Sequence, residues 1–175
     1  MKNYYPIIII ALFFLFSITI NAQISFVEDT AVPFEGVTES DAVFADIDGD
    51  NDLDVMISGT NALGVKVTNL YTNDGLGVYT LVLGTPYPGV DKGDAAFADI
   101  DGDNDLDLII IGQVTPTIGL TQLYVNDGNG NFTEVLSTPF DNIWDGTVDF
   151  ADIDGDNDLD VLLTGYTSNY AESIA

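Results

Sequence analysis

Short apolar segments separated by turns rich in Asp, Asn and Gly fill the chain after residue 23. Residues 94–100 and 106–112 are apolar segments on either side of an acidic turn. Residues 120–136, like residues 67–83, are two alternating segments joined by Asn, Asp and Gly, which accept positive φ and favour a β-hairpin. Beyond the N-terminal segment, no window has the period of about 3.6 residues that indicates a helix. The pattern predicts four short strands in each unit of an all-β fold.

This four-strand unit repeats at a constant spacing of 53 residues. The segment FADIDGDNDLD occupies residues 44–54 and returns unchanged at 97–107 and 150–160. Prolines and glycines elsewhere in the unit keep the same interval, namely Pro33, Pro86 and Pro139, and Gly59, Gly112 and Gly165. Four strands in about 40–50 residues are typical of a β-propeller blade. We therefore expect an incomplete β-propeller of about three four-stranded blades, with the acidic loop between the first and second strand of each.

The register of the repeat sets the expected domain boundaries. Repeat 1 spans residues 41–93, repeat 2 spans 94–146, and a truncated repeat 3 spans 147–175. Residues 24–37 align with the last strand and exit loop of the next unit, so residues 23–40 are expected to hold the last strand of a preceding or closing blade and a linker. Propellers in one chain have about four to eight blades. The sequence is thus expected to be a fragment of a longer protein or, less favoured, to complete itself by association.

The N-terminal residues 1–22 have the three-part layout of a secretory signal peptide. Lys2 precedes an apolar run over residues 6–20, and a polar break follows, with cleavage expected after Ala22. The alternative is an uncleaved membrane anchor, but the run is short for a membrane span and has no basic stop-transfer flank. Both alternatives predict that the remainder is secreted, extracellular or at the cell surface, and cleavage would leave no membrane span.

The net charge of the chain narrows the classes of molecule that it can bind. The chain has 29 acidic residues, three lysines, no Arg and no His, which gives a formal net charge of −26. Nucleic acids and anionic membrane surfaces are therefore poor partners on Coulomb grounds, and we expect no nucleic-acid partner. Because 46% of the residues are hydrophobic, the chain has enough apolar side chains to fold. Without Cys, His or Arg, disulfides, thiol chemistry, the usual catalytic triads and phosphate clamps are also excluded.

The repeated acidic loop is a candidate metal site. Alternate residues around a tight turn can face one centre, and Gly49 and Asn51 supply the left-handed backbone freedom that such a turn needs. Oxygen ligands without His or Cys favour Ca²⁺ over Mg²⁺, with about one ion per repeat and Asp52 offering its carbonyl. The predicted metal residues are Asp46, Asp48, Asp50, Asp52 and Asp54; Asp99, Asp101, Asp103, Asp105 and Asp107; and Asp152, Asp154, Asp156, Asp158 and Asp160.

The loop has two other interpretations. An EF-hand loop has Glu at its twelfth position, but Ile57, Ile110 and Leu163 stand there in this chain. A loop flanked by strands therefore fits better than one flanked by helices. The loop could also be a solvated acidic turn that binds no metal. Three identical copies in a β context favour calcium over that alternative.

On these motifs the chain resembles the FG-GAP/VCBS-type repeats, the integrin-α-like calcium-binding blades of secreted bacterial proteins. The resemblance rests on FADIDGDNDLD in each unit and on LYTNDG and LYVNDG in the first two, and covers residues 24–175. It implies a calcium-binding β-propeller, with the side chains of Asp46, Asp48, Asp50 and Asp54, their equivalents, and the Asp52 main-chain oxygen as ligands. No Gly-Ala-Pro segment is present, so the chain is more similar to the VCBS-like branch than to integrin blades.

Three functions remain open from the sequence. The first is a calcium-stiffened extracellular scaffold or binding module for adhesion, with a glycan or protein ligand held by the loops between strands. Trp144, the one tryptophan, could stack on a sugar there, although packing between blades is the favoured role. The second is the propeller part of a secreted polysaccharide-active enzyme, although we expect no catalysis in this chain, because Asp145 and Asp149 have no identifiable acidic partner. The third is a purely structural fragment.

Overall fold

The computed structural model describes residues 25–167 and 172–174, and the expected signal peptide at residues 1–22 lies outside them. The chain divides into two compact units, Met1–Thr30 and Ala31–Ala175. Every strand of the described residues belongs to the second unit, and these residues form no helix. Accordingly, the described part of the chain contains no apolar helix of membrane-spanning length. The all-β fold predicted from the sequence is confirmed.

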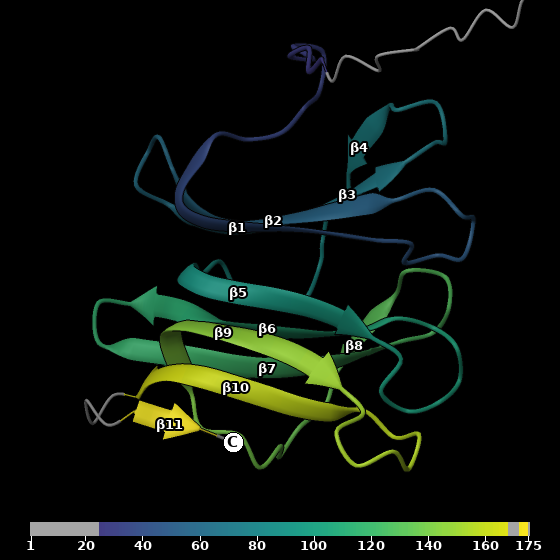
Figure 1. Ribbon diagram of the computed structural model, residues 1–175. Helices are drawn as coiled ribbons and strands as arrows, with labels where there is room; N and C mark the ends of the chain where they lie inside the picture. Colours follow the sequence, from purple (N-terminus) through teal and green to yellow (C-terminus); the bar gives the residue numbers. More distant parts are fainter. Residues whose placement is uncertain (1–24, 168–171, 175) are drawn as a thin grey trace, which may run out of the picture. The chain divides into compact units, whose positions relative to one another are not determined.

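Three antiparallel sheets make up the second unit (Figure 1). The first sheet has the order β1-β2-β3-β4, with strands Val37–Ala45, Asp54–Asn61, Lys66–Asn73 and Tyr79–Leu81. The second has the order β5-β6-β7-β8, with strands Asp91–Ala98, Asp107–Thr115, Ile118–Asn126 and Phe132–Glu134. The third has the order β11-β10-β9, with strands Ile143–Ala151 (β9), Asp160–Thr167 (β10) and Glu172–Ile174 (β11). Each sheet is therefore built from consecutive strands of one 53-residue repeat.

The second sheet lies between the other two, since β5 packs beside both β1 and β9 (Figure 1). One apolar cluster joins the first sheet to the second and includes Met56, Leu70 and Leu108. A second cluster joins the second sheet to the third and includes Ile109 and Ile143. Because the middle sheet is covered on both faces, the run Leu108–Ile111 in β6 is buried continuously rather than alternately. This position explains why the repeat carries an Ile-rich strand.

An ion pair links the first sheet to the second. Lys66 Nζ in β3 lies 2.6 Å from Asp91 Oδ1 at the start of β5 and donates a further hydrogen bond to the Gln113 carbonyl at 2.9 Å. The Thr60 hydroxyl donates to Asp91 Oδ2 at 2.6 Å. Burial by itself raises the pKa of Asp91, but the hydrogen bonds from Lys66 and Thr60 and the Lys66 charge outweigh it and hold the pKa below its usual range. The buried carboxylate is thus fully paired.

Carboxylates also join neighbouring sheets through backbone amides. Ala95 N donates to Asp41 Oδ2 at 3.2 Å, and Val148 N donates to Asp94 Oδ2 at 2.9 Å. Asp41 and Asp94 occupy the same position in successive repeats, so the same contact is made at both junctions. Burial, followed by the negative charge of Asp94, raises the pKa of Asp41. The sheets therefore stack with a repeated polar contact beside the apolar clusters.

The structure differs from the sequence expectation before β1. Residues 25–36 form no strand, although residues 24–37 align with the last strand of the next unit. The first sheet already has its own fourth strand, β4, so such a strand would need a partner strand from elsewhere. One part of the alignment does hold, because Phe34 packs on Tyr71 and Tyr79 as the equivalent Tyr87 packs on Tyr124 and Phe132.

Trp144 lies in β9 and is buried, so it does not occupy an exposed loop. A side chain on Gly119 of β7 would overlap its indole ring, which shows how closely the second and third sheets approach there. Tyr87 is buried as well, and Phe140, at the same position of the repeat, packs against the second apolar cluster. The packing role that was favoured for these aromatic side chains agrees with the structure.

Candidate metal centres

The acidic segments form the loops between the first and second strand of each sheet, and we refer to residues 46–54, 99–107 and 152–160 as the aspartate loops. Gly49 has φ of 75° and Asn51 has φ of 71°, so the chain turns twice through the left-handed region within three residues. Glycine adopts this region without strain, and Asn is among the few other residues that tolerate it. The equivalent residues of the other two loops have nearly the same φ values. The predicted backbone of the loop is therefore confirmed.

Backbone amides hold the carboxylates of the first loop in place. Gly49 N and Asn51 N donate to Asp46 at 2.9 and 3.0 Å, one to each carboxylate oxygen. Asp52 N donates to Asp50 Oδ1 at 2.9 Å. These hydrogen bonds favour the ionised carboxylates and fold the loop around them.

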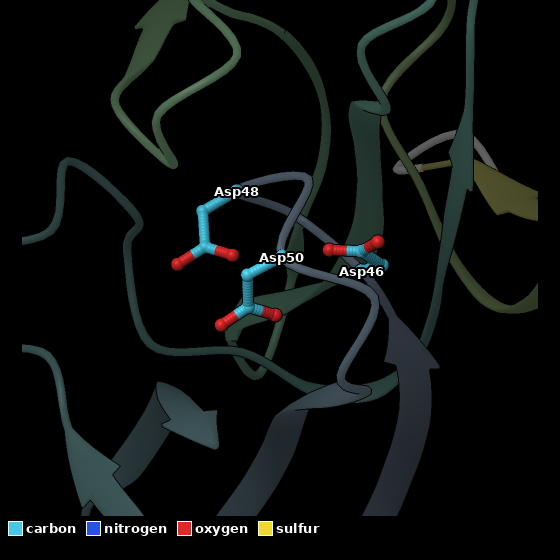
Figure 2. Close-up of side chains that lie close together, drawn as sticks. All are labelled: Asp46, Asp48 and Asp50. Atoms are coloured by element: carbon cyan, nitrogen blue, oxygen red, sulfur yellow. The ribbon is translucent and has the colours of Figure 1, made fainter. Parts of the chain in front are cut away.

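The first aspartate loop brings three carboxylates together. Figure 2 shows Asp46, Asp48 and Asp50 along one turn of the loop. One oxygen atom from each lies within 4.8 Å of the others, a separation that a single cation could span. Asp48 Oδ1 is buried and has no hydrogen-bond donor among the described residues. Burying a carboxylate oxygen without a partner costs free energy. This atom is therefore suited to coordinate a cation that the protein itself does not supply.

Asp54, at the ninth position of the loop, is held by backbone amides on both of its oxygens. Ile47 N donates to Asp54 Oδ2 at 3.1 Å, and Asn73 N of β3 donates to Asp54 Oδ1 at 2.8 Å. The side chain is buried, and burial is the largest influence on its pKa, which is raised despite these hydrogen bonds; the charges of Asp48 and Asp50 raise it further. In the first repeat Asp54 therefore connects the loop to the third strand and lies outside the gathered group.

The second and third loops gather a different trio. Asp99, Asp101 and Asp107 have oxygens within 4.8 Å of one another, as do Asp152, Asp154 and Asp160. In these loops the ninth-position residue joins the first- and third-position residues. Partial desolvation, followed by the charges of Asp103 and Asp107, raises the pKa of Asp101. The crowded carboxylates repel one another, and a bound cation would remove that repulsion.

The structure separates the remaining predicted residues from these trios. The side chain of Asp52 lies against the turn between β3 and β4, where a side chain on Gly75 would overlap its carboxylate. Asp105 lies against Gly128 in the same way, so this carboxylate belongs to the hairpin contact rather than to the gathered oxygens. The predicted metal ligand at this loop position is the main-chain oxygen of the aspartate, not its carboxylate. Three further predicted residues also lie outside the trios. They are Asp103 and Asp156, which are equivalent to Asp50, and Asp158 of the third loop.

Asn73 and Asn126 complete the loops and were not among the predicted site residues. Asn126 N donates to Asp107 Oδ1 at 2.9 Å, and its side-chain amide donates to the Ile47 carbonyl in the aspartate loop of the preceding repeat at 2.8 Å. Asn73 N makes the equivalent contact with Asp54. The recurrence of Asn-Asp-Gly after the third strand in both repeats is the sequence signal that could have identified them.

Comparison with known proteins agrees with this arrangement of repeats. Residues 112–163 match the FG-GAP-like repeat, over a stretch about one repeat long. No curated protein and no solved structure matches the chain. The matched residues begin at the end of β6 and reach into β10, so they include the third aspartate loop and connect two of the sheets. The chain therefore contains an FG-GAP-like repeat at residues 112–163, and the 53-residue unit with the same aspartate loop recurs in the residues before that match.

Proposed function

We propose that this chain is a secreted calcium-binding module in which each aspartate loop binds one Ca²⁺ and the stacked sheets are blades of a β-propeller. The observation that carries the proposal is the buried Asp48 Oδ1, which has no donor among the described residues and lies beside two more carboxylates. Ca²⁺ takes about six to eight oxygen ligands, and carboxylates and carbonyls are its usual protein ligands. The chain has no His or Cys to favour a softer metal.

The residues that would hold the ion are those that the loops gather. In the first loop these are Asp46, Asp48 and Asp50, with the main-chain oxygen of Asp52 as a further ligand. In the second and third loops they are Asp99, Asp101 and Asp107, and Asp152, Asp154 and Asp160. Bound Ca²⁺ would supply positive charge where the carboxylates repel one another. It would thereby fix the end of the first strand of each sheet to the start of the second.

The role that fits such a module is an extracellular scaffold or binding domain, for adhesion or for a glycan or protein ligand. FG-GAP repeats are typical of extracellular proteins, and the expected signal peptide agrees with export. Metal-stiffened loops leave the opposite ends of the strands for ligand contacts. Without Cys, His or Arg, the chain has none of the usual Cys–His or Ser–His nucleophile–base pairs, and we propose no catalytic activity for it.

A calorimetric titration of the purified, exported protein with CaCl₂ tests this proposal. We expect about one Ca²⁺ per aspartate loop. Asp48→Ala should remove or weaken one site and leave the other two, since the gathered carboxylates of each loop come from that loop alone. The result would be a stoichiometry lower by about one ion, with the remaining isotherm unchanged.

Asp145→Asn is the matched control. It also removes one negative charge, but Asp145 lies at the start of β9, away from the aspartate loops, and Asn tolerates its left-handed φ of 50°. The control should bind as much Ca²⁺ as the unaltered protein. Loss of all sites together in Asp48→Ala, or no heat of binding in the unaltered protein, would contradict the assignment.

A further inference from the structure

The hairpin between β7 and β8, residues 126–132 of the second sheet, lies against the aspartate loop of the first sheet. The Asn126 side chain donates to the Ile47 carbonyl at 2.8 Å. A Cβ on Gly130, in the turn of the hairpin, would lie 3.6 Å from the Ile47 side chain and 3.9 Å from Asp48 Cβ, which are ordinary van der Waals distances. The hairpin therefore reaches the loop through a hydrogen bond at its base and through the backbone of its turn.

The residue that the hairpin holds stands between two of the gathered carboxylates. Ile47 separates Asp46 from Asp48, and its side chain is 2% exposed. Its amide donates to Asp54 within the loop, whereas its carbonyl accepts from Asn126 of the next sheet. That carbonyl belongs to the planar peptide bond that leads into Asp48. The hydrogen bond from the second sheet thus helps to set the direction in which Asp48 leaves the backbone.

The Asn126 side chain is held in a fixed orientation. It is 6% exposed, and its Nδ2 donates a second hydrogen bond, to the Leu106 carbonyl at 3.2 Å. Its Oδ1 accepts from Gly128 N at 3.2 Å. An asparagine amide has two N–H donors, so both are in use. The side chain cannot turn away from Ile47 without breaking hydrogen bonds in its own sheet.

The hairpin orients the first loop but supplies no positive charge to it. Residues 126–132 contain no Lys or Arg. The one charged side chain among them, Asp127, accepts hydrogen bonds from Asn129 and Asn131 inside the turn. Asp48 Oδ1 is still buried without a donor among the described residues. The second sheet therefore positions a carboxylate whose charge a bound cation would balance.

Given the calcium binding proposed for this loop, we propose that Asn126 is a positioning residue for the first metal centre, and that Ca²⁺ bound there strengthens the junction between the first and second sheets. Groups that orient metal ligands from outside typically change metal affinity by about 10–100-fold when they are removed. The coupling is reciprocal. If the placement of the hairpin raises the calcium affinity of the loop, bound Ca²⁺ stabilises that placement by the same factor.

Hydrogen exchange of the purified, exported protein, measured by mass spectrometry in excess Ca²⁺ and in EDTA, tests the strengthening of the junction. Ca²⁺ should slow exchange in residues 46–54 and also in residues 126–134 of the next sheet. Asp48→Ala should abolish the slowing in residues 46–54 and reduce it in residues 126–134. Part of the slowing in the hairpin should remain, because Asn126 N also donates to Asp107 of the second loop.

Asp154→Ala is the matched control for this comparison. Asp154 holds the position of Asp48 in the third loop, and the hydrogen bonds found for that loop among the described residues stay within it. The control should abolish the slowing in residues 152–160 and leave that in residues 126–134 unchanged.

The outcomes separate this proposal from the calcium binding on which it depends. If Ca²⁺ slows exchange in none of the aspartate loops, the proposed function itself is wrong. If Ca²⁺ slows exchange in residues 46–54 but the hairpin responds equally in the unaltered protein and in Asp48→Ala, only the strengthening of the junction is overturned.

Calorimetric titration of Asn126→Ala with CaCl₂ tests the positioning role. The substitution should weaken one site by about tenfold or more. In the Asp48→Ala protein, which lacks that site, the same substitution should change the remaining affinities by no more than about twofold. The reason is that the contact of Asn126 with Asp107 is made by its backbone amide, which alanine retains.

Gln122→Ala is the control for the titration. It also removes an amide side chain from β7, but the hydrogen bonds of Gln122, with Glu134 and Tyr124, stay within the second sheet. It should bind Ca²⁺ as the unaltered protein does. Unchanged affinities in an Asn126→Ala protein that is folded by circular dichroism overturn the positioning role, as does an equal loss at every site. If Asn126→Ala does not fold, the exchange comparison decides, because it leaves Asn126 in place.

Discussion

At the scale of single residues, the aspartates of three loops with identical sequences have different structural roles. Asp46 and Asp48 belong to the gathered trio, whereas Asp54 is buried and accepts backbone amide hydrogens on both oxygens. Asp107 in the second loop does both, since it belongs to a trio and accepts from Ile100 N and Asn126 N. Local sequence alone does not distinguish these roles, because the three loops are identical.

Burial predicts which of these aspartates matters for folding without metal. Asp107→Ala would leave one buried and one partly buried backbone amide without acceptors and should lower the free energy of unfolding by about 2–5 kcal/mol. Asp160→Ala, its exposed equivalent, removes an acceptor from Ile153 N alone and should cost about 1 kcal/mol or less. Urea unfolding in the presence of EDTA measures both without a contribution from bound metal. Equal losses in the two variants would be inconsistent with this account.

At the scale of elements, the strands and loops follow from local pattern, while their junctions do not. The turns at Gly49 and Asn51 and the Asn-Asp-Gly hairpins were predicted because these residues favour positive φ. Glu39, Lys92 and Asp145 also have positive φ, between 46° and 50°, at irregularities in β1, β5 and β9. Glu39 and Lys92 are not turn-forming types, and Asp145-Gly146 is a turn signal in only one of the three repeats, so the shared irregularity was not predictable from the sequence.

The buried Lys66–Asp91 ion pair between the first and second sheets gives a second prediction. Lys66→Met should leave the Asp91 carboxylate buried without its cation and lower the free energy of unfolding by about 3–5 kcal/mol at neutral pH. Lys92→Met is the control. Lys92 Nζ and Glu39 Oε1 are 3.8 Å apart, and both side chains are more exposed than those of Lys66 and Asp91. The control should therefore change the free energy of unfolding by less than about 1 kcal/mol. Guanidinium unfolding measures both.

The pH dependence of this effect has a definite sign. The folded-state pKa of Asp91 lies below the usual aspartate value of 3.8, so its stabilising contribution is present above that value. The contribution is lost as the pH falls through the lower, folded-state pKa. The stability difference between Lys66→Met and the unaltered protein should therefore be largest at neutral pH and shrink in acid. A difference that stays constant down to the lowest pH at which both proteins fold would contradict the pairing.

At the scale of the whole molecule, the constant spacing of 53 residues predicted repeated sheets of four strands, and the first two sheets have that composition. The order of stacking came only from the structure, because it depends on which face of each strand is covered. The Ile-rich run in β6 does not by itself show burial on both faces, because the same residues could also form the centre of an isolated sheet. Residues 25–36, which align with a fourth strand, form none in the structure.

The central claim is that metal bound in the aspartate loops stabilises the stacked sheets, and thermal unfolding tests it most directly. With free Ca²⁺ at about 100 times Kd, one site adds about 2.7 kcal/mol to the free energy of unfolding, so Tm should rise by more than about 5 °C. Excess EDTA should reverse the rise, and NaCl at equal ionic strength should not reproduce it. A Tm that is the same in Ca²⁺ and in EDTA would contradict the claim.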